Sequence, residues 1–161
     1  DPRVPPVSRA QMRARLAAYR EAQEMDRTAD EARTRLREAL RGVTQAMEAS
    51  DGEVAAQGRA LRNELTALQE RLFTGAPCQG ICPGDPVAAA IGQPLFRLRS
   101  GKGAPTPVEE LLLARASEAL DRVLAEVNQV LSGSVAAFRD ALLEAGYTPL
   151  PDVSPIRRGA R

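Results

Sequence analysis

SRAQMRARLAAYREAQEMDRTADEARTRLREALRGVTQAMEAS, residues 8 to 50, repeats an apolar residue at steps of three and four with almost no interruption. That spacing places the apolar side chains on one face of an α-helix. Ser8 and Gln11 form a capping box at its start, and Asp51-Gly52 supplies a stop at its end. The apolar face consists of Met12, Leu16, Tyr19, Ala22, Met25, Ala29, Ala32, Leu36, Leu40, Val43 and Met47.

A helix of this size is on the order of 60 Å long at about 1.5 Å per residue, so the rest of the chain has to lie along it. The same stretch allows one alternative, a break near residues 26 to 28. There Thr28 and Glu31 spell a second capping box, T-x-x-E. Because the apolar period keeps its phase through these residues, we favour a continuous helix.

Shorter helices are predicted in the middle of the chain. Residues 52 to 74 carry leucines at helical spacing, and Gly75 supplies a stop. Residues 75 to 86, GAPCQGICPGDP, are rich in Gly and Pro and predict a loop. Two short helical segments are then expected, at residues 87 to 91 and 92 to 100.

A second long helix is predicted from Thr106 to Gly146. It opens with the clearest local signal in the chain, an N-cap Thr106, Pro107 at the first position and Glu109 closing a capping box. Gly133 lies inside the helix and would allow a restart. The apolar phase is kept across it, so we favour one long helix with a weak point.

The fold class that follows is all-α. We expect an elongated antiparallel helical bundle of two long helices with a shorter, broken middle leg. The 161 residues are 43% hydrophobic but only 3% aromatic, which suits helices packed side by side. The expected divisions are a linker at residues 1–7, a helical bundle domain at 8–148 and an extended tail at 149–161. The first residues, which include no initiator Met, are those expected of a mature product or an excised domain.

Charge is nearly balanced, with 22 basic and 21 acidic residues. Because arginines and acidic residues are interleaved, we interpret the Arg-rich composition as genomic base bias rather than phosphate binding, and expect no nucleic-acid partner. No run approaches the roughly 18 apolar residues that a membrane span needs, so no span is expected.

Catalytic and metal-binding chemistry finds little support. The chain has no His, which removes Ser-His-Asp and Cys-His systems, His-containing zinc motifs and the Glu-x-x-His ligands of di-iron bundles. Gly101-Lys102-Gly103 lacks the frame of a phosphate loop. We therefore predict no enzyme activity, no cofactor, and no catalytic, cofactor-binding or metal-ligating residue. The acidic residues weighed as paired carboxylates and assigned to a solvated helix face are Glu109 and Glu110, and Glu118, Asp121 and Glu126.

Cys78 and Cys82 are the only cysteines, in the sequence CQGIC. Gly80 between them lets the loop fold back, so the sulfurs can reach disulfide geometry. We favour a disulfide in an oxidising compartment over free thiols; so small a ring would contribute only about 2 kcal/mol. A redox role is disfavoured by the C-x-x-x-C spacing.

Two stretches carry a family resemblance. Asp1-Pro2-Arg3-Val4 before an Arg- and Ala-rich helix, and the run from Gly103-Ala104-Pro105-Thr106 to Ala145-Gly146-Tyr147-Thr148-Pro149-Leu150, resemble the C-terminal helical region of bacterial sortilin-type β-propeller proteins. These proteins are also described as BNR-repeat or glycosyl hydrolase-like. The middle of the chain, including CQGIC, departs from that pattern. Any glycosidase activity of the family would belong to the propeller, so no catalytic residue is carried over.

The resemblance implies a noncatalytic helical interaction or scaffold module of an extracytoplasmic protein, secreted or periplasmic, whose partner is the parent propeller or another protein chain. The alternative is an independent coiled-coil adaptor or oligomerisation protein, in which the long helix pairs with a copy of itself. Poor heptad regularity around residues 26 to 33 weighs against a strict homomeric coil.

Overall fold

The computed structural model of the chain describes residues 7–74 and 86–147, and all regular structure in these two ranges is helical. The prediction of an all-α bundle is therefore confirmed. The elements in chain order are α1 (Arg9–Glu48), α2 (Gly52–Gln69), the π-helical turn η1 (Glu70–Thr74), α3 (Pro86–Ser100), α4 (Pro107–Val130), the π-helical segment η2 (Leu131–Val135) and α5 (Ala136–Glu144).

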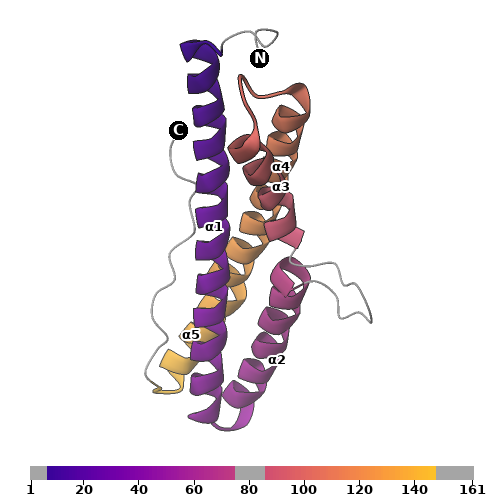
Figure 1. Ribbon diagram of the computed structural model, residues 1–161. Coiled ribbons are helices and arrows are strands. Elements are labelled where there is room, and N and C mark those ends of the chain that lie inside the picture. The colour runs from indigo at the N-terminus through magenta and orange to yellow at the C-terminus, as the bar shows by residue number, and fades with distance from the viewer. Residues whose placement is uncertain (1–6, 75–85, 148–161) are drawn as a thin grey trace, which may run out of the picture.

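The helices form an elongated bundle around α1, which runs along most of the length of the molecule (Figure 1). From the end of α1 the chain turns back through α2, and α3 continues to the end where α1 begins. There it turns again, and α4, η2 and α5 follow one another without a gap toward the opposite end. α1 packs against α2, α3 and α4, so it is the element that all other legs share.

The capping boxes predicted at the starts of the two long helices are formed. At α1, the backbone N–H of Ser8 donates to the side-chain oxygen of Gln11 at 2.8 Å, and the N–H of Gln11 donates to Ser8 Oγ at 3.2 Å. At α4, the N–H of Thr106 donates to Glu109 Oε2 at 2.7 Å, and the N–H of Glu109 donates to Thr106 Oγ1 at 3.3 Å. These contacts satisfy backbone donors that the first helical turn leaves free, and so fix where each helix starts.

α1 is continuous through the second capping box, as favoured from its apolar period. Thr28 is buried, with 1% of its surface exposed. Its hydroxyl donates to the backbone carbonyl of Glu24 at 2.9 Å, one turn earlier, rather than capping a new helix. The T-x-x-E pattern therefore lies within a continuous helix and does not start a new one.

The two short helices expected at residues 87–91 and 92–100 are wrong: α3 is one helix from Pro86 to Ser100, with Pro94 inside it. Proline removes one backbone hydrogen bond from a helix. Here its ring is buried and continues the inner face formed by Val87, Ile91 and Leu98, whose steps of four, three and four residues share one phase. Packing of that face against α1 and α4 holds the helix through the proline.

The core is built from aliphatic side chains along the shared length of the bundle. Small residues set the closest approach: at Gly58 of α2, an added Cβ would lie 3.0 Å from Met47 Cβ of α1 and 3.0 Å from Phe138 Cζ of α5. The largest fully buried hydrophobic side chains are Met25, Leu36, Val43, Leu65, Ile91, Leu120, Val127 and Leu142.

The weak point predicted at Gly133 takes the form of η2, in which the helix widens without ending. Leu131 and Val135 remain buried on either side of it. An added Cβ at Gly133 would meet nothing within 4 Å, so packing does not demand a glycine there.

Several predicted features lie outside the described residues: positions 1–6 of the linker, the disulfide pair Cys78 and Cys82, and the tail at 149–161. Within the described ranges, no helix is long and apolar enough to cross a membrane.

Candidate functional site

The apolar face of α1 is not covered along its first three turns. Buried positions on this helix begin at Ala22. Before that, Met12 and Leu16 expose 52% and 46% of their surfaces, and Val7 exposes 36%. The sequence pattern predicted one face packed throughout, and the structure corrects it, because no residue of α1 before Ala22 is buried. Large exposed apolar side chains beside a groove are typical of docking surfaces.

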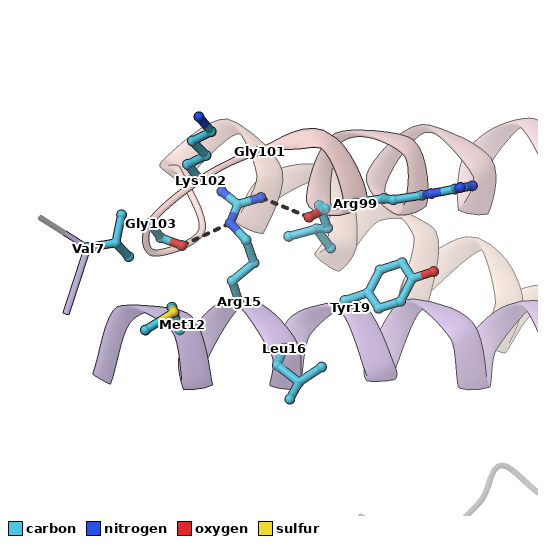
Figure 2. Close-up of a pocket in the computed structure, with 10 residues that line it drawn as sticks. Val7, Met12, Arg15, Leu16, Tyr19, Arg99, Gly101, Lys102 and Gly103 are labelled. Carbon is cyan, nitrogen blue, oxygen red and sulfur yellow. Dashed lines mark hydrogen bonds between the residues drawn. The ribbon is translucent and has the colours of Figure 1, made fainter. Parts of the chain in front are cut away.

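A groove of about 430 Å³ lies between this part of α1 and the segment that joins α3 to α4 (Figure 2). We call the groove and the exposed start of α1 the head surface. Figure 2 shows the side chain of Arg15 pointing toward the joining segment and that of Leu16 pointing away from it. The groove is lined by Val7, Met12, Arg15, Leu16, Tyr19, Leu98, Arg99, Gly101, Lys102 and Gly103.

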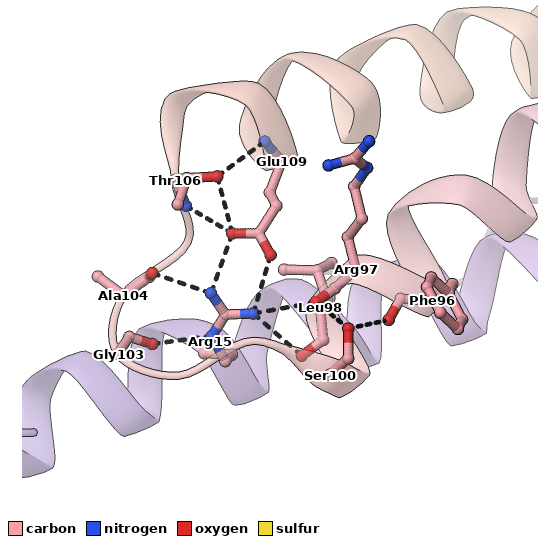
Figure 3. Close-up of polar contacts among 9 residues, drawn as sticks. All are labelled: Arg15, Phe96, Arg97, Leu98, Ser100, Gly103, Ala104, Thr106 and Glu109. Atoms are coloured by element: carbon pink, nitrogen blue, oxygen red, sulfur yellow. Dashed lines mark hydrogen bonds and ion pairs between the residues drawn. The ribbon is translucent and has the colours of Figure 1, made fainter.

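Arg15 and Glu109 form the ion pair that anchors the floor of the groove (Figure 3). Arg15 Nη1 donates to Glu109 Oε1 at 3.0 Å, and Nη2 donates to Oε2 at 2.9 Å, so the contact is bidentate. Only 12% of the Arg15 side chain and 7% of the Glu109 side chain are accessible. Bidentate pairs of this kind combine strong hydrogen bonds with a fixed geometry.

The remaining donors of Arg15 go to backbone carbonyls. Nε donates to Gly103 at 2.9 Å, Nη1 to Leu98 at 3.1 Å, and Nη2 to Ala104 at 3.1 Å. One guanidinium thus joins α1 to the last turn of α3 and to the approach to α4. A Cβ at Gly101 would lie 2.3 Å from Arg15 Nη1, so a side chain there would displace the guanidinium from this position.

The electrostatics follow from this geometry. Hydrogen bonds from Arg15, with smaller contributions from Thr106, hold the pKa of Glu109 at about 2, below its usual 4.5, although burial alone would raise it. Glu109 is therefore a carboxylate at neutral pH and neutralises Arg15. The Arg15–Glu109 pair supports the groove and leaves neither charge available for a ligand.

The charge that faces solvent at this end is mainly positive. Arg99 and Lys102 line the groove and are exposed. Residues 7–20 and 97–111, which form this end of the bundle, hold seven basic and only two acidic residues, and one of those two is the paired Glu109. The head surface is thus cationic in a chain whose formal net charge is +1.

The residues considered as paired carboxylates are not brought together as a site. Glu109 belongs to the pair with Arg15, and Glu126 of α4 is hydrogen-bonded to Arg71 of η1. Glu118 is exposed on α4. In the described part of the chain, no group of three or more His, Cys, Asp or Glu residues is arranged to hold a metal ion. Gly101 and Gly103 only superficially resemble a phosphate loop. In the structure, the side chain of Arg15 packs against Gly101, and Gly103 turns the chain with a φ of 80°.

Sequence reasoning missed Arg15 and the charge of the head surface. Arg15 is one of several arginines in an Arg-rich helix, and its partner lies 94 positions away. A signal for the second feature was present: residues 2 to 20 contain five arginines and no acidic residue, which is not the interleaved pattern of the chain as a whole.

Comparisons with protein-family models, with curated proteins and with solved structures find no significant match to this chain.

Proposed function

We propose that this chain is a noncatalytic helical interaction module that docks another protein surface through its head surface. The observation that carries the proposal is the uncovered start of α1, where Met12 and Leu16 stay exposed beside a groove although the apolar face they belong to is buried from Ala22 onward. Covering the exposed halves of these two side chains would contribute about 1 kcal/mol each.

The groove suits a partner better than a small substrate. The groove is open, and its exposed charges are the cations Arg99 and Lys102. The buried ion pair beneath the groove maintains the shape of the groove. A surface that is apolar at its centre and charged at its edge is the usual anatomy of a protein interface. The edge charges steer an acidic partner, and the apolar centre retains it.

The context we propose is an extracytoplasmic protein. Its basis is the resemblance to the C-terminal helical region of sortilin-type β-propeller proteins and the cysteine pair Cys78 and Cys82. In that setting the docked surface belongs to the parent propeller or to another chain.

The alternative function, an independent adaptor or oligomerisation protein, is favoured by the same uncovered face on α1, because an unpaired apolar stripe on a long helix can associate with another helix.

A photo-crosslinking experiment in the producing cell tests the proposal. A photoreactive residue replaces Leu16 in one variant and the exposed Glu118, halfway along α4, in a matched control. We expect a discrete crosslinked protein from position 16 and none from position 118. Equal labelling from both positions, or none from position 16, would mean that the head surface is not a docking site.

A further inference from the structure

A second groove lies at the opposite end of the bundle, between α2 and α5, with a volume of about 700 Å³. Buried Leu61 and Phe138 form its floor, and the small residues Ala60, Ala137 and Ala141 line its sides. We call it the tail groove. Its apolar floor and small side residues leave room for bulky side chains from another surface.

The charges of the tail groove are negative. Glu64, Asp140 and Glu144 line it and are exposed, and no basic residue is among the residues that line it. Two of the carboxylates have local contacts: Ser134 Oγ donates to Glu64 Oε1 at 3.3 Å, and Asp140 lies 3.7 Å from Arg139 Nε. The surrounding residues 44–64 and 134–147 hold six acidic and three basic residues, so this end of the bundle is acidic as a whole.

The head surface carries the complementary pattern. The helical period places Arg9, Arg13 and Arg20 on the flank of α1 next to Leu16, while Arg99 and Lys102 stand in the groove itself. The partial positive charge of a helix N-terminus adds to these cations, and α1 has no acidic residue in its first turn.

We propose that the start of α1 docks in the tail groove of a second copy of this chain, with Met12 and Leu16 against its apolar floor and the arginines against Glu64, Asp140 and Glu144. This proposal rests on the proposed function and names the partner of the head surface. Two apolar grooves of opposite charge on one chain favour a second copy over an unrelated acidic protein.

The two surfaces cannot meet within one molecule, because they lie at opposite ends of the elongated bundle (Figure 1). Contact therefore joins different copies head to tail. Two bundles that lie antiparallel, each with the start of α1 in the tail groove of the other, form a closed dimer. Copies that follow one another in a row form an open chain. Both arrangements use the same contact.

Sedimentation velocity on the purified chain tests the contact. We expect the average mass to rise above that of the monomer with increasing protein concentration at low salt. The mass should fall back as salt is added, because exposed charges are screened over about 10 Å at 0.1 M salt. A chain that stays monomeric at every concentration and salt overturns the proposal. The proposed function would then be tested separately by crosslinking from position 16, and capture of a different protein there would support it.

Charge-reversal variants separate this contact from other modes of association. A head variant carries Arg9→Glu and Arg13→Glu, and a tail variant carries Glu64→Arg and Glu144→Arg. All four side chains are exposed, so circular dichroism should stay that of the parent chain. Each variant alone should associate about tenfold or more weakly, since like charges then face each other. An equal mixture of the two should recover the association, because the acidic heads of one variant then meet the basic tails of the other, and normal heads meet normal tails.

The matched control reverses two exposed carboxylates away from both surfaces, Glu38→Arg on α1 and Glu118→Arg on α4. It has the same net charge as the tail variant and should associate like the parent chain. If the control loses association as strongly as the tail variant does, net charge rather than the tail groove governs it, and the proposal is wrong. Association that survives either reversal, or a mixture that stays monomeric, would overturn it as well.

Discussion

Replacing Arg15 by leucine should destabilise the bundle by about 3 kcal/mol. The fall of the Glu109 pKa from 4.5 to about 2 corresponds to about 3 kcal/mol in favour of the carboxylate in the folded state, and Arg15 is its largest cause. Removing one partner of a buried ion pair typically costs about 3 to 5 kcal/mol, because the other charge stays buried and unpaired. Thr106 still donates to Glu109 in the variant, which keeps the loss near the lower value.

The assay is equilibrium unfolding in urea at neutral pH, with Arg37→Leu as the matched control. Arg37 is exposed on α1, and its Nε donates to the carbonyl of Arg33 at 3.4 Å. We expect Arg37→Leu to change the free energy of unfolding by less than about 0.5 kcal/mol. If Arg15→Leu costs no more than this control, the ion pair does not hold the end of the bundle, and our description of the groove floor is wrong.

The same pair predicts an acid limb of the stability curve. Glu109 has a lowered pKa in the folded state, so its contribution is complete above about pH 4.5 and is lost as the pH falls toward about 2. The free energy of unfolding of the parent chain should drop across that range more than that of Arg15→Leu. Parallel acid limbs in the two proteins would contradict the coupling between Arg15 and Glu109.

Three further outcomes are expected. Gly58→Ala should lower the free energy of unfolding by about 1 to 2 kcal/mol, because its Cβ would press on side chains of α1 and α5, and an unchanged urea midpoint would contradict that packing. Gly133→Ala should raise it by about 0.5 to 1 kcal/mol, since open space surrounds the new Cβ and alanine favours helix; a loss of stability would mean that η2 needs its glycine. Thiol titration of the unfolded, unreduced protein should find no free thiol if Cys78 and Cys82 are bridged, and two free thiols would reject the predicted disulfide.

Short-range sequence signals predicted where α1 and α4 begin and that α1 is continuous. The capping residues Ser8 and Thr106 gave the starts of α1 and α4 because an N-cap contact is made within four residues of sequence. The apolar period gave the continuity of α1 through Thr28 because its phase shows which face is buried. The division of α3 at residue 92 was wrong because the apolar residues on both sides of it share one buried face, and burial of Pro94 on that face outweighs the lost hydrogen bond.

The candidate site could not be predicted in the same way, because it depends on contacts between distant segments. The capping role of Glu109 was readable, but its second role, as the partner of Arg15, requires α1 and α4 to start at the same end of the bundle. Likewise, a periodic apolar face shows which side of α1 can be buried, while the placement of the other segments around α1 decides how much of that side is covered. Met12 and Leu16 stay exposed for this reason.

Oxidative footprinting of the methionines tests directly whether the start of α1 is a docking surface. Met12 is 52% exposed and Met25, three to four turns further along the same helix, is fully buried, so Met25 serves as an internal reference. In the dilute purified chain, Met12 should oxidise much faster than Met25. In the producing cell, Met12 should be protected while Met25 is unchanged. Met12 oxidised as fast in the cell as in the dilute chain would contradict the account.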